Sequence, residues 1–274
     1  MENSYLSRMN SRDIRLITLE QSKRAHVGHI GSALSVADII ASLYGAVLRI
    51  GKHDDPDRDR FILSKGHAAL ALYAALALRG FMPSSQLNTY CGDGSLLGVH
   101  PERDLPGVDF CSGSLGQGLS FGAGAALAAR MQGSSRRVFV LMSDAECNEG
   151  SIWEAAMFAA HQRLGNLTAI IDLNGQQALG YTKDVFDMPN MVERWRAFGW
   201  DADEIDGHDV EAMTEKMTSH GGDRPQMLVA RTTFGKGVSF MQNQIQWHYL
   251  PMTDDQYQQA LAEVRGASPN QSAQ

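Results

Sequence analysis

The sequence predicts an α/β protein with three layers, in which a parallel sheet lies between helices. Residues 137–142, 167–173 and 227–232 are largely apolar runs, as is typical of strands that are buried on both faces. Helical segments separate these runs, and strands that alternate with helices form parallel sheets. The chain has 274 residues, 43% of them hydrophobic, so it can bury the core of such a domain.

The first half of the chain predicts three helices and one short strand. Ser35 and Asp38 are spaced as in a capping box, which predicts that a helix begins there, and the apolar residues that follow fall on one helical face. In chain order we expect a helix at 11–24, a helix at 36–47, a strand at 60–63 and an Ala/Leu-rich helix at 68–78.

The second half has a different composition. A short apolar run at 108–111 leads into the glycine-rich segment SGSLGQG at 112–118. The elements expected after it are a small-residue helix at 119–130, a strand at 137–142, a helix near 153–164, a strand at 167–173, a helix near 210–217 and a strand at 227–232. We find no repeat and no linker, so one domain is expected over 1–266, with 267–274 as a disordered tail.

Composition argues against several classes of protein. The net charge is −7 and there is no basic run, so nucleic acid is not an expected partner. No stretch approaches the roughly 20 apolar residues of a membrane span, and the polar N-terminus lacks the apolar core of a signal peptide. The three cysteines form neither a disulfide framework nor a zinc ligand set. A soluble, cytoplasmic protein is the expectation.

Asp144 and Asn174 each stand just beyond the end of a predicted strand. Ligands bind beyond the carboxyl ends of parallel strands, so neighbouring strands would bring these two oxygen donors together with a backbone carbonyl of the same turn. Such hard donors suit Mg²⁺, which would tether a diphosphate. The glycine-rich loop would bring backbone amides to the same phosphates. Either residue alone is a common turn former, and only the pair favours a metal site.

A nicotinamide dinucleotide site is the main competing interpretation, since its strand, glycine-rich loop, helix, strand and acidic residue occur in a similar order. The glycine spacing argues against it. GSLGQG reads G-x-x-G-x-G instead of G-x-G-x-x-G, and Gly122 and Gly124 lie inside the predicted helix. We therefore prefer the metal–diphosphate site.

Four histidines stand beside glycine or at a break between elements: His29, His67, His100 and His248. Any one of them alone is more often a turn residue. Together they predict a polar cluster that moves protons near neutral pH. The other five lack this setting and are interpreted as structural or solvated; they are His26, His53, His161, His208 and His220.

Five ordered segments resemble the thiamine diphosphate-binding half of transketolase. Four of them are GHIGSALSVAD (28–38), DRFILSKGH (59–67), GVHPE (98–102) and SGSLGQG (112–118). The fifth is similar to the family's thiamine diphosphate motif: it begins at Asp144, continues through Glu149-Gly150 and Trp153-Glu154-Ala155, and ends at Asn174. The resemblance covers about residues 11–259 and implies the pyrophosphate-domain fold that binds thiamine diphosphate.

The resemblance implies a role for each matching residue. Asp144, Asn174 and the carbonyl of Gln176 would bind Mg²⁺. The residues that would contact the cofactor are Gly113, Ser114, Leu115, Ser143, Asp144, Ala145, Glu149, Asn174, His67 and His248. The groups expected to act in catalysis are His29, His67, His100 and His248, with Glu149 and Glu154 in the acidic relay that links paired active sites in the family. The sequence departs from the family pattern at four positions. Glycines of the family are replaced by Ser143 and Ala145, and prolines by Ile30 and Ser114, but no polar ligand is lost.

Transketolases are more than twice as long as this chain. The glutamate that activates the cofactor's aminopyrimidine lies in their pyrimidine-binding domain, which this sequence does not contain. The resemblance therefore implies the N-terminal subunit of a split transketolase, a transferase that moves a two-carbon ketol unit from a ketose (phosphate) donor to an aldose acceptor. A C-terminal subunit would be its partner, in a symmetric heterotetramer.

Two alternatives remain for the function. A thiamine diphosphate-binding subunit of a 2-oxo acid decarboxylase or dehydrogenase would use the same cofactor, but the contexts of His29, His67 and His100 argue against it. A non-catalytic binding subunit would not need the metal ligands and the four histidines. The sequence does not identify the sugars.

Overall fold

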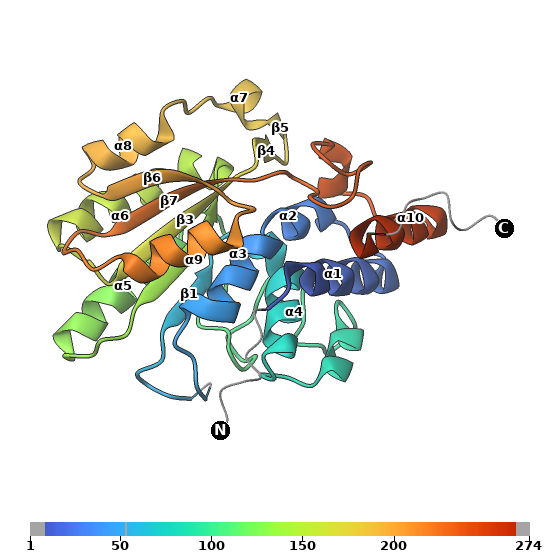
Figure 1. Ribbon diagram of the computed structural model, residues 1–274, viewed down its shortest axis with the longest axis horizontal. Coiled ribbons are helices and arrows are strands. Elements are labelled where there is room, and N and C mark those ends of the chain that lie inside the picture. The colour runs from blue at the N-terminus through green and yellow to red at the C-terminus, as the bar shows by residue number, and fades with distance from the viewer. Residues whose placement is uncertain (1–8, 53, 267–274) are drawn as a thin grey trace.

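The computed structural model describes residues 9–52 and 54–266. Its centre is a five-stranded parallel sheet in the order β1-β2-β3-β7-β6 (Figure 1). In that order the strands are β1 (Arg60–Leu63), β2 (Val138–Ser143), β3 (Leu167–Leu173), β7 (Gln226–Arg231) and β6 (Asp201–Asp206). A small antiparallel pair, β4 (Gln176–Gln177) and β5 (Gly180–Tyr181), follows β3. The predicted α/β fold class is confirmed.

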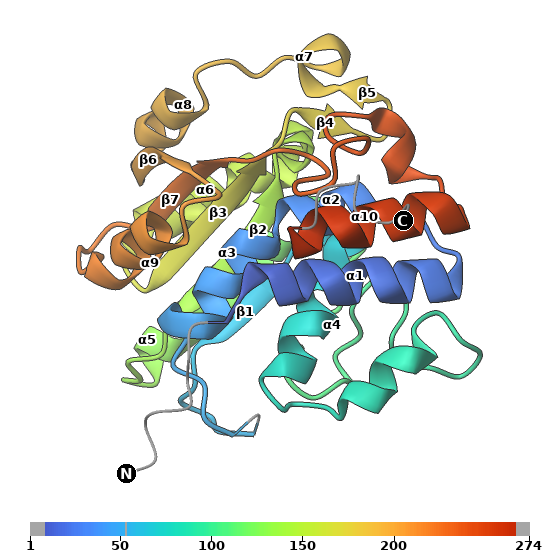
Figure 2. The same cartoon turned by 45° about the vertical axis from the view of Figure 1, so that its right-hand side comes forward.

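Helices cover both faces of the sheet (Figures 1 and 2). On one face lie α5 (Gly118–Met131), α6 (Gly150–His161) and α8 (Met191–Ala197). The other face carries α3 (Ala37–Ser42), α4 (Ala69–Leu78) and α9 (Val210–Ser219), with α1 (Ser11–Ala25), α2 (Ile30–Ser35) and α10 (Asp254–Arg265) around them. Short turns complete the chain: a π-helical turn at Leu43–Val47, 3-10 turns at Gly66–Ala68, Ser84–Thr89, Ala145–Asn148 and Ile245–His248, and the one-turn helix α7 (Thr182–Val185).

Alternate side chains of each central strand enter different cores. In β2, Phe139 and Leu141 pack with the helices around α4, whereas Val138, Val140 and Met142 pack with α5 and α6. Successive side chains of a strand point to opposite faces, and helices cover both faces of this sheet. The strand is therefore apolar throughout, which is the pattern that the sequence shows.

The predicted capping box at Ser35 and Asp38 is wrong. Helix α2 already begins at Ile30, and Ser35 is its last residue. The Ser35 hydroxyl donates to the Ser32 carbonyl and to Asp172, while Asp38 bonds to Arg15. Both side chains are therefore held by other parts of the fold and leave the amides of α3 uncapped.

The sequence-based expectation did not include the helices α2, α7, α8 and α10 or the strands β4, β5 and β6. Strand β6 has the sequence DADEID, whose acidic residues disfavour a strand, and its pairing with β7 determines its conformation. Helix α10 begins with a true capping box, in which Thr253 accepts from the Gln256 amide and the Gln256 side chain accepts from the Thr253 amide.

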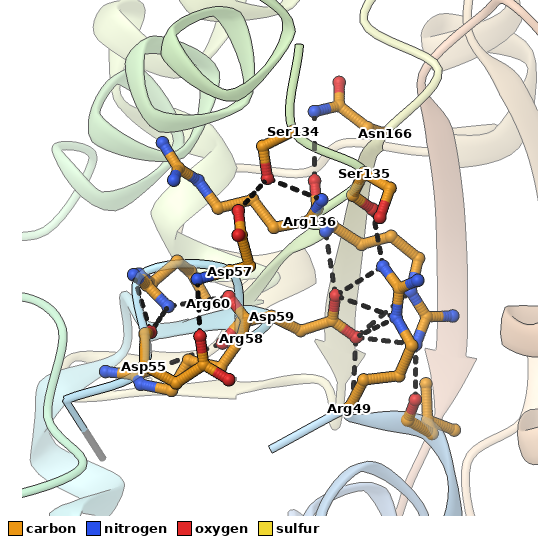
Figure 3. Close-up of polar contacts among 12 residues, drawn as sticks. Arg49, Asp55, Asp57, Arg58, Asp59, Arg60, Ser134, Ser135, Arg136 and Asn166 are labelled. Carbon is orange, nitrogen blue, oxygen red and sulfur yellow. Dashed lines mark hydrogen bonds and ion pairs between the residues drawn. The ribbon is translucent and has the colours of Figure 1, made fainter. Parts of the chain in front are cut away.

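The buried carboxylate of Asp59 joins the amino ends of β1 and β2, which lie opposite the carboxyl ends of these parallel strands. Figure 3 shows the polar contacts around Asp59 and Arg49. Asp59 is fully buried and accepts hydrogen bonds from the backbone amides of Arg49, at 2.9 Å, and Arg137, at 2.8 Å. Both guanidinium groups also bond to it. Burial alone would raise the pKa of Asp59, but these partners hold it below its usual value. The network fixes where the two strands start.

Within the described residues, no helix has the length and apolar character needed to cross a membrane. The predicted disordered tail, residues 267–274, lies outside the described part of the chain.

Candidate active site

The carboxyl ends of β1, β2, β3 and β7 lie along one edge of the sheet (Figure 1). Strands β2 and β3 are parallel neighbours, with Ser143 paired to Asp172 at their carboxyl ends. Asp144 and Asn174 follow directly, so the two predicted metal ligands lie at adjacent strand ends. The metal-site hypothesis depends on the two strands being neighbours, and this condition is met.

Asp144 is a buried acid, with a side chain that three donors orient. Its Oδ2 accepts from the Gly175 amide at 2.9 Å and from the Thr182 hydroxyl at 3.0 Å, and its Oδ1 accepts from the Ala145 amide at 2.9 Å. None of the ion pairs among the described residues includes Asp144. Burial and the charge of Asp172 raise the pKa of Asp144 to about 6. The carboxylate is therefore short of positive charge.

Asn174 and Gln176 belong to the same turn. The Asn174 Nδ2 donates to Asp172 at 2.7 Å, and its Oδ1 accepts from the Gln176 amide at 2.9 Å. The intervening Gly175 amide donates to Asp144. The turn that contains Asn174 therefore also orients Asp144, the other candidate metal ligand. Gln176 is buried, and neither its side-chain oxygen nor its nitrogen has a hydrogen-bond partner among the described residues.

The donor set at this edge fits Mg²⁺. It combines an uncompensated carboxylate with amide and carbonyl oxygens of one turn, the hard ligands that Mg²⁺ prefers. No cluster of three or more His, Cys, Asp or Glu side chains in the described part of the chain is arranged to hold a metal. Backbone, phosphate or water oxygens would therefore have to complete the coordination.

Asp172 connects the site to its surroundings, and the sequence-based reasoning missed it. It is fully buried and forms an ion pair with the fully buried Lys65. Three further side chains bond to its carboxylate: Ser35, Asn174 and Thr232. The available signal was an acid inside an otherwise apolar strand, because a buried charge needs partners.

The glycine-rich loop passes close to two other site segments. A Cβ on Gly113 would lie 3.3 Å from Cγ of His100, and one on Gly116 would lie 2.7 Å from Cβ of Glu149. Gly116 also has a φ of +86°, which favours glycine. The residues before it, Gly113 to Leu115, are exposed. Helix α5 begins at Gly118, so the loop ends at a helix N-terminus with free amides.

The four predicted histidines come together. The ring centroids of His29 and His67 are 5.7 Å apart, those of His67 and His248 are 6.3 Å apart, and those of His29 and His248 are 6.5 Å apart. His248 also stacks on Phe234 at 4.5 Å. His100 lies beside Gly113. The predicted cluster is thus present.

Three of these histidines, His29, His67 and His248, are set up as neutral groups. Burial lowers the pKa of His29 and lowers that of His67 well below its usual value, with Lys65 adding to the effect on His67. Burial, with Lys65 and His29, lowers the pKa of His248 to about 4. Nδ1 of His29 and Nε2 of His248 are buried, and neither has a hydrogen-bond partner in the part of the chain that the structure describes. Each can bond to a hydroxyl of a ligand.

Glu149 and Glu154 lie at the start of helix α6. Glu149 precedes the first residue of α6, Glu154 lies on that helix, and both are exposed. Ser143 and Ala145 flank Asp144, and the Ser143 amide donates to Glu146 at 3.2 Å. The roles assigned to these four residues remain predictions.

Comparison with known proteins gives one family. The family model described as "Transketolase, thiamine diphosphate binding domain" matches residues 7–273. The 6-deoxy-6-sulfo-D-fructose transketolase subunit SqwG of Clostridium sp. (strain MSTE9) is 40% identical over 258 residues, which cover 92% of this chain and 93% of the relative. An apulose-4-phosphate transketolase subunit of Phocaeicola vulgatus is 41% identical over 245 residues, which cover 88% of this chain and 87% of that relative.

Solved structures agree with the sequence relatives. The transketolase of Campylobacter jejuni superimposes with a TM-score of 0.88 at 28% identity, covering 98% of this chain and 44% of that one. The transketolase from Leishmania mexicana gives a TM-score of 0.86 at 29% identity, covering 95% and 41%. This chain therefore spans about two-fifths of the solved transketolases.

These matches, added to the donor set and the histidine cluster at one sheet edge, define a thiamine diphosphate-binding domain of a transferase. The chain belongs to the transketolase family. Because it matches relatives that are named subunits over nearly their whole length, it is an N-terminal transketolase subunit.

Proposed function

We propose that this subunit, with a partner, binds thiamine diphosphate and Mg²⁺ and transfers a two-carbon ketol unit from a ketose (phosphate) donor to an aldose acceptor. One observation carries the proposal: the buried Asp144, which no ion pair among the described residues neutralises, accepts a hydrogen bond from the turn that carries Asn174, at the edge where four histidines lie together. When bound, the cofactor supplies the electron sink that such a transfer requires.

The metal and the diphosphate would be held at the strand ends. Asp144, the Asn174 side-chain oxygen and the Gln176 carbonyl would bind Mg²⁺, and the positive charge would relieve the buried Asp144. The exposed segment Gly113–Leu115 would line the cofactor, with the Leu115 side chain against its rings. Ser143 and Ala145 would flank the diphosphate.

The histidines would handle the sugar. A buried imidazole with a free ring nitrogen, as at His29 Nδ1 and His248 Nε2, orients a hydroxyl by a hydrogen bond. Since the pKa of each buried ring is lowered, the neutral form prevails at pH 7 and accepts a proton from the substrate. His67 and His100 would complete this cluster.

A partner subunit would supply the rest of the active site. The relatives' names call them subunits, and this chain matches only part of the length of the solved transketolases. The partner would carry the pyrimidine-binding domain with its catalytic glutamate. Exposed Glu149 and Glu154 would meet a second active site in a symmetric heterotetramer.

Reconstitution tests this function. The tagged chain is isolated from its native host, the co-purifying chain is identified by mass, and the pair is assayed with thiamine diphosphate and Mg²⁺. Donors are xylulose 5-phosphate, apulose 4-phosphate and 6-deoxy-6-sulfo-D-fructose, with pyruvate to detect 2-oxo acid chemistry. We expect ketol transfer that needs both chains. Decarboxylation of pyruvate without ketol transfer, or inertness with partner and cofactors present, would refute the proposal.

A further inference from the structure

Glu146 is a buried acid that the proposed chemistry does not use. It lies in the 3-10 turn Ala145–Asn148 after β2 and is fully buried. None of the ion pairs among the described residues includes it. Its carboxylate instead accepts from the Ser64 hydroxyl, from the Gly116 amide at 2.8 Å and from the Ser143 amide at 3.2 Å.

These three donors belong to three separate segments of the site. Ser64 follows β1 and precedes the turn that carries His67, Ser143 ends β2 and precedes Asp144, and Gly116 lies in the glycine-rich loop. One carboxylate therefore joins the loop to two strand ends. The fit is close, because a Cβ on Gly118 would lie 2.3 Å from the Ser64 Oγ.

Both polar backbone groups of Gly116 are held. Its amide donates to Glu146, and its carbonyl accepts from the Ser151 hydroxyl at 2.8 Å. The peptide orientation at Gly116 is thus fixed, while Gly113–Leu115 just before it stay exposed. A bond from an amide to a carboxylate is stronger than one to a neutral oxygen, so the charge of Glu146 strengthens this anchor.

We propose that Glu146 is a positioning residue that holds the glycine-rich loop in its cofactor-binding conformation. It acts through Gly116 and does not touch the reacting atoms. This inference rests on the proposed function, since it assigns the loop to thiamine diphosphate. The inference predicts different effects on cofactor affinity and on turnover. Loss of Glu146 weakens cofactor binding, and the enzyme saturated with cofactor stays active.

A graded set of variants tests the anchor. Ser64→Ala keeps the bond from the carboxylate to Gly116, Glu146→Gln keeps an acceptor but loses the charge, and Glu146→Ala loses both. Glu193→Gln, an exposed acid on α8, is the matched control. Hydrogen exchange of residues 112–118 is followed in the isolated chain, and the apparent KM for thiamine diphosphate and the kcat are measured in the complex with its partner.

We expect exchange of residues 112–118 to be at least about 10-fold faster in Glu146→Gln and faster still in Glu146→Ala, with β3 peptides unchanged. The KM for thiamine diphosphate should rise about 10-fold in Glu146→Gln, with kcat at saturation within about twofold. Ser64→Ala and Glu193→Gln should resemble wild type.

Wild-type exchange or a wild-type KM in both Glu146 variants would overturn the positioning role. A wild-type complex that binds no thiamine diphosphate would overturn the proposed function itself, and the exchange data would still show whether Glu146 anchors the loop.

Discussion

The imidazole of His208 lies with Nδ1 2.7 Å from Oδ2 of Asp38, joining the loop after β6 to helix α3. On the other side of the ring, Nε2 accepts from the Thr233 amide at 2.9 Å. Because Nε2 is the acceptor, Nδ1 carries the proton and donates to Asp38. Arg15 completes the set by bonding to both carboxylate oxygens.

The His208–Asp38 pair stabilises a segment that contacts the candidate active site. Thr233, which it holds, is flanked by Thr232, whose hydroxyl bonds to Asp172, and by Phe234, which stacks on His248. The sequence analysis interpreted His208 as structural or solvated. In the structure, His208 fixes the start of the segment that leads to His248.

Replacing Asp38 should make stability less dependent on pH in acid. Burial alone would raise its pKa, but hydrogen bonds from His208 and Arg15 outweigh burial and hold the pKa below its usual value. A carboxyl group whose pKa is lower in the folded state stabilises the fold above its unfolded pKa of about 4, and this stabilisation is lost as the pH falls. Asp38→Asn should cost about 3–5 kcal/mol at pH 7, because Arg15 is left buried without its counter-charge.

Urea unfolding between pH 7 and pH 3 measures this effect. The difference in stability between wild type and Asp38→Asn should shrink as the pH falls below about 4. Asp104→Asn removes an exposed acid and serves as the control. A constant difference across this range would contradict the stabilising role of the Asp38 charge.

Replacing Asp144 should raise the stability of the metal-free protein and abolish metal binding. Asp144→Asn removes a buried charge that forms no ion pair within residues 9–52 and 54–266, so the free energy of unfolding without Mg²⁺ should rise by about 1–3 kcal/mol. Asp144→Ala should leave the fold intact and abolish Mg²⁺-dependent binding of thiamine diphosphate. Calorimetric titration with and without Mg²⁺ checks the binding, and an unchanged affinity would remove Asp144 from the metal site.

His100 should matter for turnover more than for binding. It lies at the outer, exposed side of the cluster, beside Gly113. His100→Ala should change the affinity for thiamine diphosphate by less than about twofold and lower kcat by about 100-fold, the range for loss of a proton-transfer group. His220→Ala, before β7 and outside the cluster, is the control. Full activity of His100→Ala would return this residue to a structural role.

Gly28 and Gly124 form a matched pair of substitutions. A Cβ on Gly28 would lie 2.4 Å from the Tyr249 carbonyl oxygen, so Gly28→Ala should push the segments of His29 and His248 apart and cost at least about 2 kcal/mol. Gly124 has open space around it inside α5, and Gly124→Ala should gain about 0.5–1 kcal/mol. Thermal unfolding of the two variants measures both, and equal melting temperatures would contradict this difference in packing.

The sequence predicts the parts of this site that follow from local rules. Asp144 and Asn174 were found because parallel strands end at one edge, and the histidines were found at breaks between elements. Asp172 was missed because its partners Lys65 and Ser35 come from distant segments. The same distant contact makes the Ser35 signature misleading, since a capping residue must keep its hydroxyl free for the helix amides.

Strand β6 has a consequence for the behaviour of the protein in solution. It forms one border of the sheet, where unpaired backbone groups offer a template for a strand of another molecule. Its side chains include Asp201, Asp203, Glu204 and Asp206, and the first three pair with arginines or a lysine of the same chain. A second copy that added its own β6 would bring two acidic strands side by side, and like charges that lie opposite each other destabilise strand pairing. The acidic composition that makes this strand difficult to predict from the sequence therefore also disfavours aggregation through the edge of the sheet.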